Sequence, residues 1–242
     1  DSTLTAYFDT NVYNLAVNIA AGQDIMGSVN GSNATAKHFL NYQISAIPVT
    51  GYHFVQWNDG STTNPRTVTL TSDSTFSASF DTNHYNLAVN IAAEQSAMGS
   101  VSGSQTAKHF LTYQIEAMPI TGCHFTGWTD GIMDNPRTVS LKSDSCFTAT
   151  FDTNTYNLAV AIAAGQNIMG NVEGSNATAK HFLNYQIEAS PITGCHFTGW
   201  TDGIMDNPRT VTLTSDSTFT ATFDTNSYII TAIAAIDNRT DL

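Results

Sequence analysis

Positive charge is scarce in this sequence. Only 12% of the 242 residues are charged, with 8 basic and 20 acidic side chains and a formal net charge of −12. Nucleic-acid binding needs a basic face, and docking on anionic lipid needs clustered Lys or Arg. The charge balance therefore argues against both kinds of partner.

Long apolar runs are also missing. None reaches the roughly 20 residues that a membrane-spanning helix needs, so no membrane insertion is expected. No signal peptide is visible at the amino terminus, and the 3 cysteines are too few for a disulfide framework. Thr, Ser and Asn are plentiful instead, which is typical of a polar β-sheet surface and predicts a mainly β fold.

One ten-residue motif occurs three times. It reads GYHFVQWNDG at Gly51–Gly60, GCHFTGWTDG at Gly122–Gly131 and the same at Gly194–Gly203. It carries the chain's 3 Trp residues, which are spaced by 71 and 72 positions. A fixed period of this kind predicts tandem modules, here of about 72 residues each.

The period sets the expected domain boundaries. The opening DSTLTAYFDTN matches DSTFTATFDTN, which closes the last full copy, so any signal peptide would lie upstream. The predicted divisions are 1–11, the closing strand of a preceding copy; 12–83, repeat 1; 84–154, repeat 2; 155–226, repeat 3; and 227–242, the start of a fourth, divergent copy. The linker Asp81–His84 is short, and a hairpin turn at Asp-Thr-Asn is the alternative to a plain connection.

Alternating apolar residues predict five or six short strands in each repeat. In repeat 1 the alternation marks strands from Tyr13 to Ile19, around Val29, from Tyr42 to Ala46, from Phe54 to Trp57, through Val68 and Leu70, and from Phe76 to Phe80. No segment has the pattern of an amphipathic helix. A single helical turn at Ala36–Leu40 is the only helical expectation.

The aromatic pair of each motif is the predicted structural core, because Phe and Trp bury large apolar areas. These residues are Phe54, Trp57, Phe125, Trp128, Phe197 and Trp200. Solvent-facing Trp side chains would instead indicate a glycan-binding platform.

The positions of the three cysteines leave open whether two of them form a disulfide bond. Cys123 and Cys195 stand where repeat 1 has Tyr52, and Cys146 stands where the other repeats have Thr, so all three occupy packing positions. A Cys123–Cys146 bridge within repeat 2 is the alternative.

No catalytic, cofactor or metal site is expected. The repeated His residues (His38, His109, His181 and His53, His124, His196) lack the converging ligands of a zinc site and are assigned to surface or edge positions. The Asp residues after each Trp lack EF-hand spacing and are assigned to turns rather than calcium. One Arg follows Asn-Pro in each repeat, and we expect it to pair with the turn Asp or with the Trp face.

Taken together, the motifs resemble a known family. The matching residues in repeat 1 are YNLAVNIA, Gly27-Ser28-Val29, Ala46-Ile47-Pro48, the Gly51–Gly60 motif, Thr67–Leu70 and Thr75–Phe80. This pattern is similar to the divergent branch of the internalin-type B-repeats. The resemblance implies β-grasp-like modules strung along secreted or cell-surface bacterial proteins, and it implies no enzyme activity.

Three functions follow as hypotheses. The first is a non-catalytic stalk of an adhesin-like protein, an elongated monomer that holds a distal binding or catalytic domain away from the cell. The second is an extracellular fibre subunit that joins head to tail through unpaired terminal strands, with Leu4, Ala6, Phe8, Tyr228 and Ile230 as the candidate contact residues. The third is a set of repeats that bind a host protein or glycan.

Overall fold

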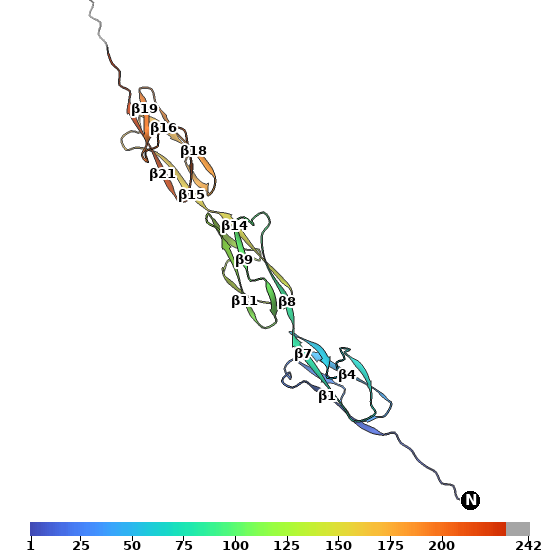
Figure 1. Cartoon of the computed structure of the whole chain (residues 1–242). Coiled ribbons are helices and arrows are strands. Elements are labelled where there is room, and N and C mark those ends of the chain that lie inside the picture. The colour runs from blue at the N-terminus through green and yellow to red at the C-terminus, as the bar shows by residue number, and fades with distance from the viewer. Residues whose placement is uncertain (231–242) are drawn as a thin grey trace, which may run out of the picture. The chain divides into compact units, whose positions relative to one another are not determined.

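The computed structural model describes residues 1–230, and every regular element within them is a β-strand. Each repeat folds into seven strands in the same order (Figure 1). The mainly β fold class and the tandem organisation predicted from the sequence are confirmed. No helix within residues 1–230 is long and apolar enough to cross a membrane.

The strand bounds follow the repeat closely. Repeat 1 contains β1 (Val12–Ile19), β2 (Gly27–Asn30), β3 (Asn33–Lys37), β4 (Asn41–Pro48), β5 (Tyr52–Trp57), β6 (Arg66–Thr69) and β7 (Ser74–Thr82). Repeat 2 contains β8 (His84–Ile91), β9 (Gly99–Ser102), β10 (Gln105–Lys108), β11 (Thr112–Pro119), β12 (Cys123–Trp128), β13 (Arg137–Ser140) and β14 (Ser145–Thr153). Repeat 3 contains β15 (Thr155–Ile162), β16 (Gly170–Glu173), β17 (Asn176–Lys180), β18 (Asn184–Pro191), β19 (Cys195–Trp200), β20 (Arg209–Thr212) and β21 (Ser217–Thr225).

The chain divides into two compact units, and the boundary runs through repeat 2. The first unit consists of residues 1–92, 101–118 and 127–150. The second consists of residues 93–100 and 119–126 and of the chain from 151 onward. The first unit therefore contains all of repeat 1, and the second contains all of repeat 3.

Each repeat is built from two sheets. In repeat 1 a four-stranded sheet has the order β3-β1-β7-β5, with β1 and β7 parallel and the outer pairs antiparallel. A three-stranded antiparallel sheet has the order β2-β4-β6. Repeat 3 has the same two sheets, β17-β15-β21-β19 and β16-β18-β20.

Alternation along the strands places one apolar set between the two sheets. In repeat 1 this core joins Leu15 of β1, Ile44 of β4, Trp57 of β5 and Phe80 of β7, all at most 3% exposed. Repeat 3 has an equivalent core. Since a module of about 72 residues buries only about 60% of its unfolded surface, these few large side chains carry much of its stability.

A β-bulge explains how the Phe-x-x-Trp spacing fits a strand. Residues three apart on a regular strand point to opposite faces. In β5 the pairing with β7 shifts between Phe54 and Gln56, so that one residue is extra. The shift brings Phe54 and Trp57 to the same face, where their ring centroids are 5.3 Å apart.

Two local structures that the sequence suggested, a helical turn and an alternative hairpin turn, do not form. Ala36–Leu40 forms no helical turn: residues Asn33–Lys37 form β3, which pairs antiparallel with β1. Asp-Thr-Asn is not a hairpin turn, because β7 and β8 belong to different sheets and only Asn83 separates them. Pro48 is the last residue of β4, where it pairs with Gly27, so the strand stops at this proline as expected.

The proposed terminal strands are absent from the described chain. Residues 1–11 form no strand, and Leu4 and Phe8 are 99% and 94% exposed. In the full repeats the matching strand lies between two partners, as β7 lies between β1 and β5, whereas residues 1–11 have neither partner within this sequence. Tyr228 and Ile230 also lie outside any strand, and the rest of the segment to Ala234 lies outside the described residues.

Candidate functional site

Residues 1–230 contain no group of three His, Cys, Asp or Glu side chains that could hold a metal ion. Trp57, Trp128 and Trp200 are at most 3% exposed, so none offers a face to a sugar ring. Phe54, Phe125 and Phe197 are partly buried. All three cysteines are free, with Cys123 buried and Cys146 exposed. Two repeated structures remain as candidate sites: the loop that follows each Trp, and the junction between successive repeats.

The loop after each Trp is held by the same hydrogen bonds in every repeat. The Trp57 amide N–H donates to the Ser61 carbonyl at 2.9 Å, and its indole N–H donates to the Thr63 carbonyl at 3.0 Å. The equivalent indole bonds reach the Asp134 and Asp206 carbonyls at 3.0 Å. The buried Trp therefore packs in the core of its own module and also fixes the shape of the loop.

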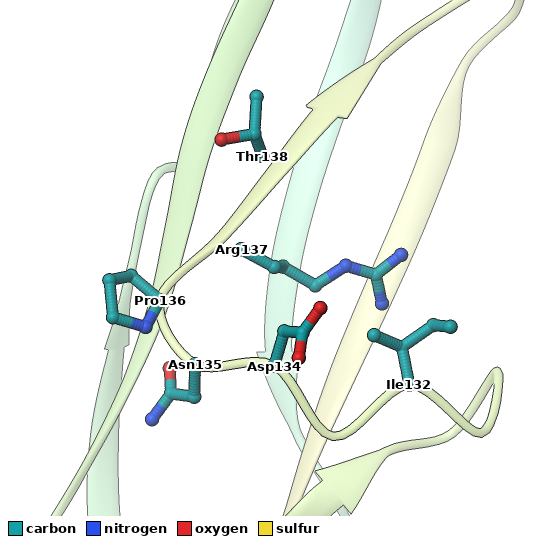
Figure 2. A pocket seen from close by; sticks show the side chains of 6 residues that line it. All are labelled: Ile132, Asp134, Asn135, Pro136, Arg137 and Thr138. Atoms are coloured by element: carbon teal, nitrogen blue, oxygen red, sulfur yellow. The ribbon is translucent and has the colours of Figure 1, made fainter.

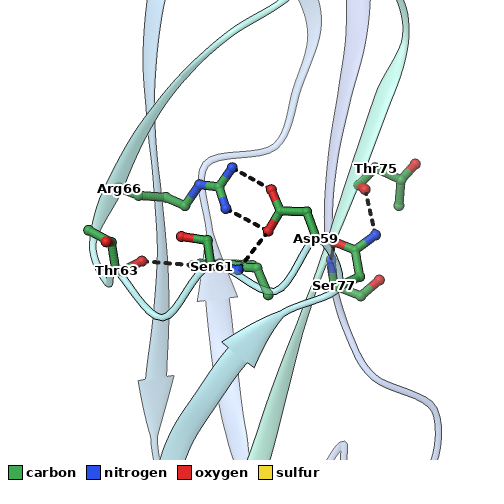
Figure 3. A network of polar contacts seen from close by, with 8 residues as sticks. Asp59, Ser61, Thr63, Arg66, Thr75 and Ser77 are labelled. Carbon is green, nitrogen blue, oxygen red and sulfur yellow. Dashed lines mark hydrogen bonds and ion pairs between the residues drawn. The ribbon is translucent and has the colours of Figure 1, made fainter.

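An ion pair closes the same loop. Arg66 donates to both carboxylate oxygens of Asp59 at 2.8 and 2.7 Å (Figure 3). Repeats 2 and 3 have the equivalent pairs Arg137–Asp130 and Arg209–Asp202, both at 2.8 Å. The hydrogen bond from its Arg lowers the pKa of Asp59 and that of Asp202 below the usual Asp value.

The Arg also lies over an aromatic ring. The guanidinium carbon of Arg66 is 4.8 Å from the centroid of Phe76, and that of Arg137 is 4.9 Å from Phe147 and 5.8 Å from Trp128. Arg137 contacts both of the partners predicted from the sequence, the turn residue Asp130 and the ring of Trp128. The Phe of the closing strand is a further partner that the sequence pattern did not indicate.

An open pocket lies beside this loop in repeats 2 and 3. In repeat 2 it is lined by Ile132, Asp134, Asn135, Pro136, Arg137 and Thr138 (Figure 2). In repeat 3 the equivalent residues 204 and 206–210 line it. The Asn135 side chain is not free to bind, because it exchanges two hydrogen bonds with the backbone of Ala117 at 2.8 and 2.6 Å.

The junction between repeats 1 and 2 lies within the first unit and is tightly packed. The Asn83 amide N–H donates to the Gly51 carbonyl at 2.8 Å, and the Asn83 carbonyl accepts the His109 amide N–H at 2.9 Å. The Asn83 side-chain oxygen lies 3.1 Å from Nδ1 of His53. The linker residue is thus hydrogen-bonded to both repeats that it connects.

A His-Phe pair of repeat 2 packs onto the motif glycine of repeat 1. His109 is only 7% exposed, and its Nδ1 lies 3.2 Å from the Tyr85 hydroxyl. The Phe110 ring centroid is 5.2 Å from that of Tyr52. A Cβ added to Gly51 would lie 2.6 Å from both His109 and Phe110, so the contact requires glycine at this position.

The Phe of this pair has a strained backbone. Phe110 has φ +68°, and the equivalent Phe39 and Phe182 have φ +61° and +64°. A bulky residue in the left-handed region is unusual, and strain of this kind gathers at functional positions. It turns the His-Phe pair outward from its own sheet, toward the preceding repeat.

The junction between repeats 2 and 3 lies within the second unit and repeats these contacts. Asn154 donates to the Gly122 carbonyl and accepts from the His181 amide, both at 2.8 Å. His181 is 7% exposed, and its ring occupies the space where a Cβ on Gly122 would lie. Lys180 and Asp152 add an exposed ion pair at 3.8 Å.

The outermost repeats show the same surfaces without a neighbouring repeat. His38 is more exposed than His109, and its Nδ1 has no hydrogen-bond partner. Phe39 is 77% exposed, against 59% for Phe110. No heavy atom of the described chain lies within 4 Å of a Cβ added to Gly194. Burial of the His-Phe pair therefore comes from the preceding repeat.

The assignment of these His residues to the surface was wrong for two of them. His109 and His181 are buried because a different repeat covers them, which a single-repeat pattern cannot indicate. The available signal was the recurrence of His-Phe beside a recurring Gly in a chain with almost no linkers.

Comparison with protein families gives three matches along the chain. The model of the divergent InlB B-repeat domain matches residues 14–84, 89–155 and 158–227. Comparison with curated proteins finds no match.

Among solved structures, the Bacillus anthracis TIE protein is similar at a TM-score of 0.42 and 7% sequence identity. The match covers 87% of this chain and 50% of the TIE protein chain. The chain thus spans about half the length of that protein.

Proposed function

Because the chain belongs to the divergent InlB B-repeat family, we propose that it is the spacer region of a bacterial secreted or cell-surface protein. Its three repeats act without catalysis. Their task is to hold a functional domain, of adhesin type, at a distance from the cell surface.

The observation that carries this proposal is the packed junction. A spacer keeps its reach only if neighbouring modules resist bending, and a single-residue linker alone limits bending only in part. Here the linker Asn is hydrogen-bonded to both neighbours, and a buried His with a partly exposed Phe beside it fills the contact. The same junction occurs twice, which suits a chain lengthened by duplication.

The buried aromatic residues support a mechanical role over a glycan-binding role. Each Trp is used twice inside its module, once for core packing and once to fix the loop through its indole N–H. A glycan platform needs that face in solvent. Glycan recognition through the Trp residues is therefore not part of the proposal.

Small-angle X-ray scattering tests the spacer role. A module of about 72 residues has a diameter of roughly 30 Å, so three in series reach about 90 Å with a radius of gyration of about 26 Å. A single globule of this length would have a radius of gyration of about 18 Å. A value near the smaller figure would reject the spacer.

A further inference from the structure

Repeats 2 and 3 share a short exposed sequence that repeat 1 lacks, in the three residues between the Asp-Gly turn and Asn-Pro. These residues, here named the tip, are Ser61–Thr63 in repeat 1, Ile132–Asp134 in repeat 2 and Ile204–Asp206 in repeat 3. Two tips are therefore apolar and acidic, and one carries only hydroxyl groups.

The difference does not come from a different loop conformation. In all three repeats the Trp amide donates to the first tip residue at 2.9 Å and the indole donates to the third at 3.0 Å. The Asp carboxylate of the turn accepts the first tip amide in each repeat, at 3.1 to 3.3 Å. The tip side chains change while the backbone frame stays the same.

The apolar side chains are largely exposed, although the Met205 sulfur lies over Gly199 of β19, 2.9 Å from where a Cβ would be. Met133 and Met205 are 69% and 67% exposed, and Ile132 and Ile204 are 42% and 43% exposed. Single exposed apolar residues are ordinary on a protein surface. Here, however, Ile and Met are adjacent on a fixed loop in two repeats, and Ser and Thr replace them in the third. This pattern is typical of a surface that binds a partner.

The tip also carries an unpaired negative charge. The Asp134 carboxylate has no ion-pair partner within residues 1–230, and the neighbouring Arg137 is engaged by Asp130. Asp206 is in the same position beside the Arg209–Asp202 pair. Each tip thus presents apolar side chains next to a free carboxylate, at the mouth of the pocket described above.

We propose that the tips of repeats 2 and 3 each form a docking site for a protein segment that carries Lys or Arg beside apolar side chains. The basic group pairs with Asp134 or Asp206, and the apolar groups cover Ile and Met. Charge complementarity favours this partner, because the chain has a net charge of −12. A loop that is already ordered loses little conformational freedom on binding, and two equal sites on one chain add avidity.

Other ligand classes fit the tip less well. The aromatic rings nearest to it offer no stacking face to a sugar, because Trp128 is buried and Arg137 lies over Phe147. Nucleic acid and anionic lipid would be repelled by the free carboxylates.

The test uses the intact chain and immobilised peptides. The probe is the peptide Gly-Lys-Leu-Lys-Leu-Lys-Leu-Gly at high density on a biosensor surface. In the matched peptides, Glu replaces Lys or Ser replaces Leu. The key variant gives both later repeats the tip of repeat 1, through the substitutions Ile132→Ser, Met133→Thr, Asp134→Thr, Ile204→Ser, Met205→Thr and Asp206→Thr. Because repeat 1 folds with this tip, the variant is expected to fold, and circular dichroism checks that it does.

A control variant removes two Ile and two negative charges elsewhere on the exposed surface. Its substitutions are Asp24→Asn, Ile25→Ser, Ile168→Ser and Glu173→Gln. We expect it to bind the Lys-Leu peptide like the natural chain. The reverse variant, Ser61→Ile with Thr62→Met and Thr63→Asp, adds a third tip and should strengthen binding.

The expected result is tighter binding to the Lys-Leu peptide than to either matched peptide. Exchanging both tips should weaken that binding at least tenfold, and exchanging one should remove most of the avidity. Asp134→Asn alone should weaken it about two- to fivefold, the effect of one exposed ion pair. Equal binding by the natural chain and the two-tip variant would overturn the proposal, as would an equal loss in the control variant.

Discussion

Gly51, Gly122 and Gly194 provide a direct test of the coupling between repeats, because they are the same position in three different surroundings. All three have φ between +84° and +93°, so an Ala side chain is strained at each of them. The left-handed conformation costs an L-residue roughly 1–2 kcal/mol. Only Gly51 and Gly122 also face the His-Phe pair of a following repeat.

Replacement by Ala should therefore lower the stability of the fold by a smaller amount at Gly194 and by a larger amount at Gly51 and Gly122. Gly194→Ala should destabilise repeat 3 by about 1–2 kcal/mol, the cost of the backbone alone. Gly51→Ala and Gly122→Ala should cost about 1–3 kcal/mol more, because the added Cβ overlaps the His ring and forces the junction apart. Displacement should expose the His ring, which is only 7% exposed in the natural chain.

Hydrogen exchange measured by mass spectrometry resolves the two effects. In Gly51→Ala, the peptide that contains residues 109–111 should exchange faster than in the natural chain, and in Gly122→Ala the peptide that contains residues 181–183 should do so. Urea denaturation gives the total loss for each variant. If all three variants lose the same stability and neither peptide changes, the junctions do not couple the repeats.

Three further predictions concern the modules and the chain ends. Trp128→Ala should destabilise repeat 2 by about 3–5 kcal/mol in chemical denaturation, whereas native Trp fluorescence typical of exposed indole would contradict the burial. Asp59 and Asp202 have folded pKa values below their unfolded values, so their ion pairs stabilise the fold at neutral pH and lose that effect as the pH falls below about 4. Replacement of both by Asn should therefore cost at most about 1 kcal/mol per site at pH 7, since both carboxylates are exposed. The cost should shrink as the pH falls through the lowered folded pKa values, and a cost that does not depend on pH would refute the ion-pair account. Sedimentation at high concentration should give a monomer, and fibres that disappear when residues 1–11 are deleted would restore the terminal-strand hypothesis.

The sequence predicted the modules well because their signals are local. Apolar alternation located most strands of repeat 1, and the 71- and 72-residue spacing of Trp gave the number of repeats. Apolar alternation did not predict β3, because Ala36 is the one buried residue in Asn33–Lys37 and the strand therefore shows no alternation. It also missed the bulge in β5, although Phe and Trp three residues apart in one strand already require one if both face the core.

The contacts at the junctions could not be predicted from the sequence, because they join residues of different repeats. A residue such as His109 looks polar and surface-exposed within its own repeat, and its burial depends on Gly51, which lies 58 residues earlier in the chain. The left-handed Phe110 has no sequence signature, because bulky residues seldom adopt that conformation. By contrast, the Asp59–Arg66 pair was foreseen, since turn chemistry places both residues within one short loop.

The spacer role requires that the distance between repeats varies little. Double electron–electron resonance measures the distribution of that distance between two spin labels. A cysteine-free chain can be made with residues the repeats already use, through Cys123→Tyr, Cys195→Tyr and Cys146→Thr. Spin labels at Ser72→Cys and Ser215→Cys then report on equivalent exposed positions of repeats 1 and 3. The account predicts one narrow distance distribution near two module lengths, about 60 Å. A broad distribution that extends to short distances would show freely jointed repeats and contradict it.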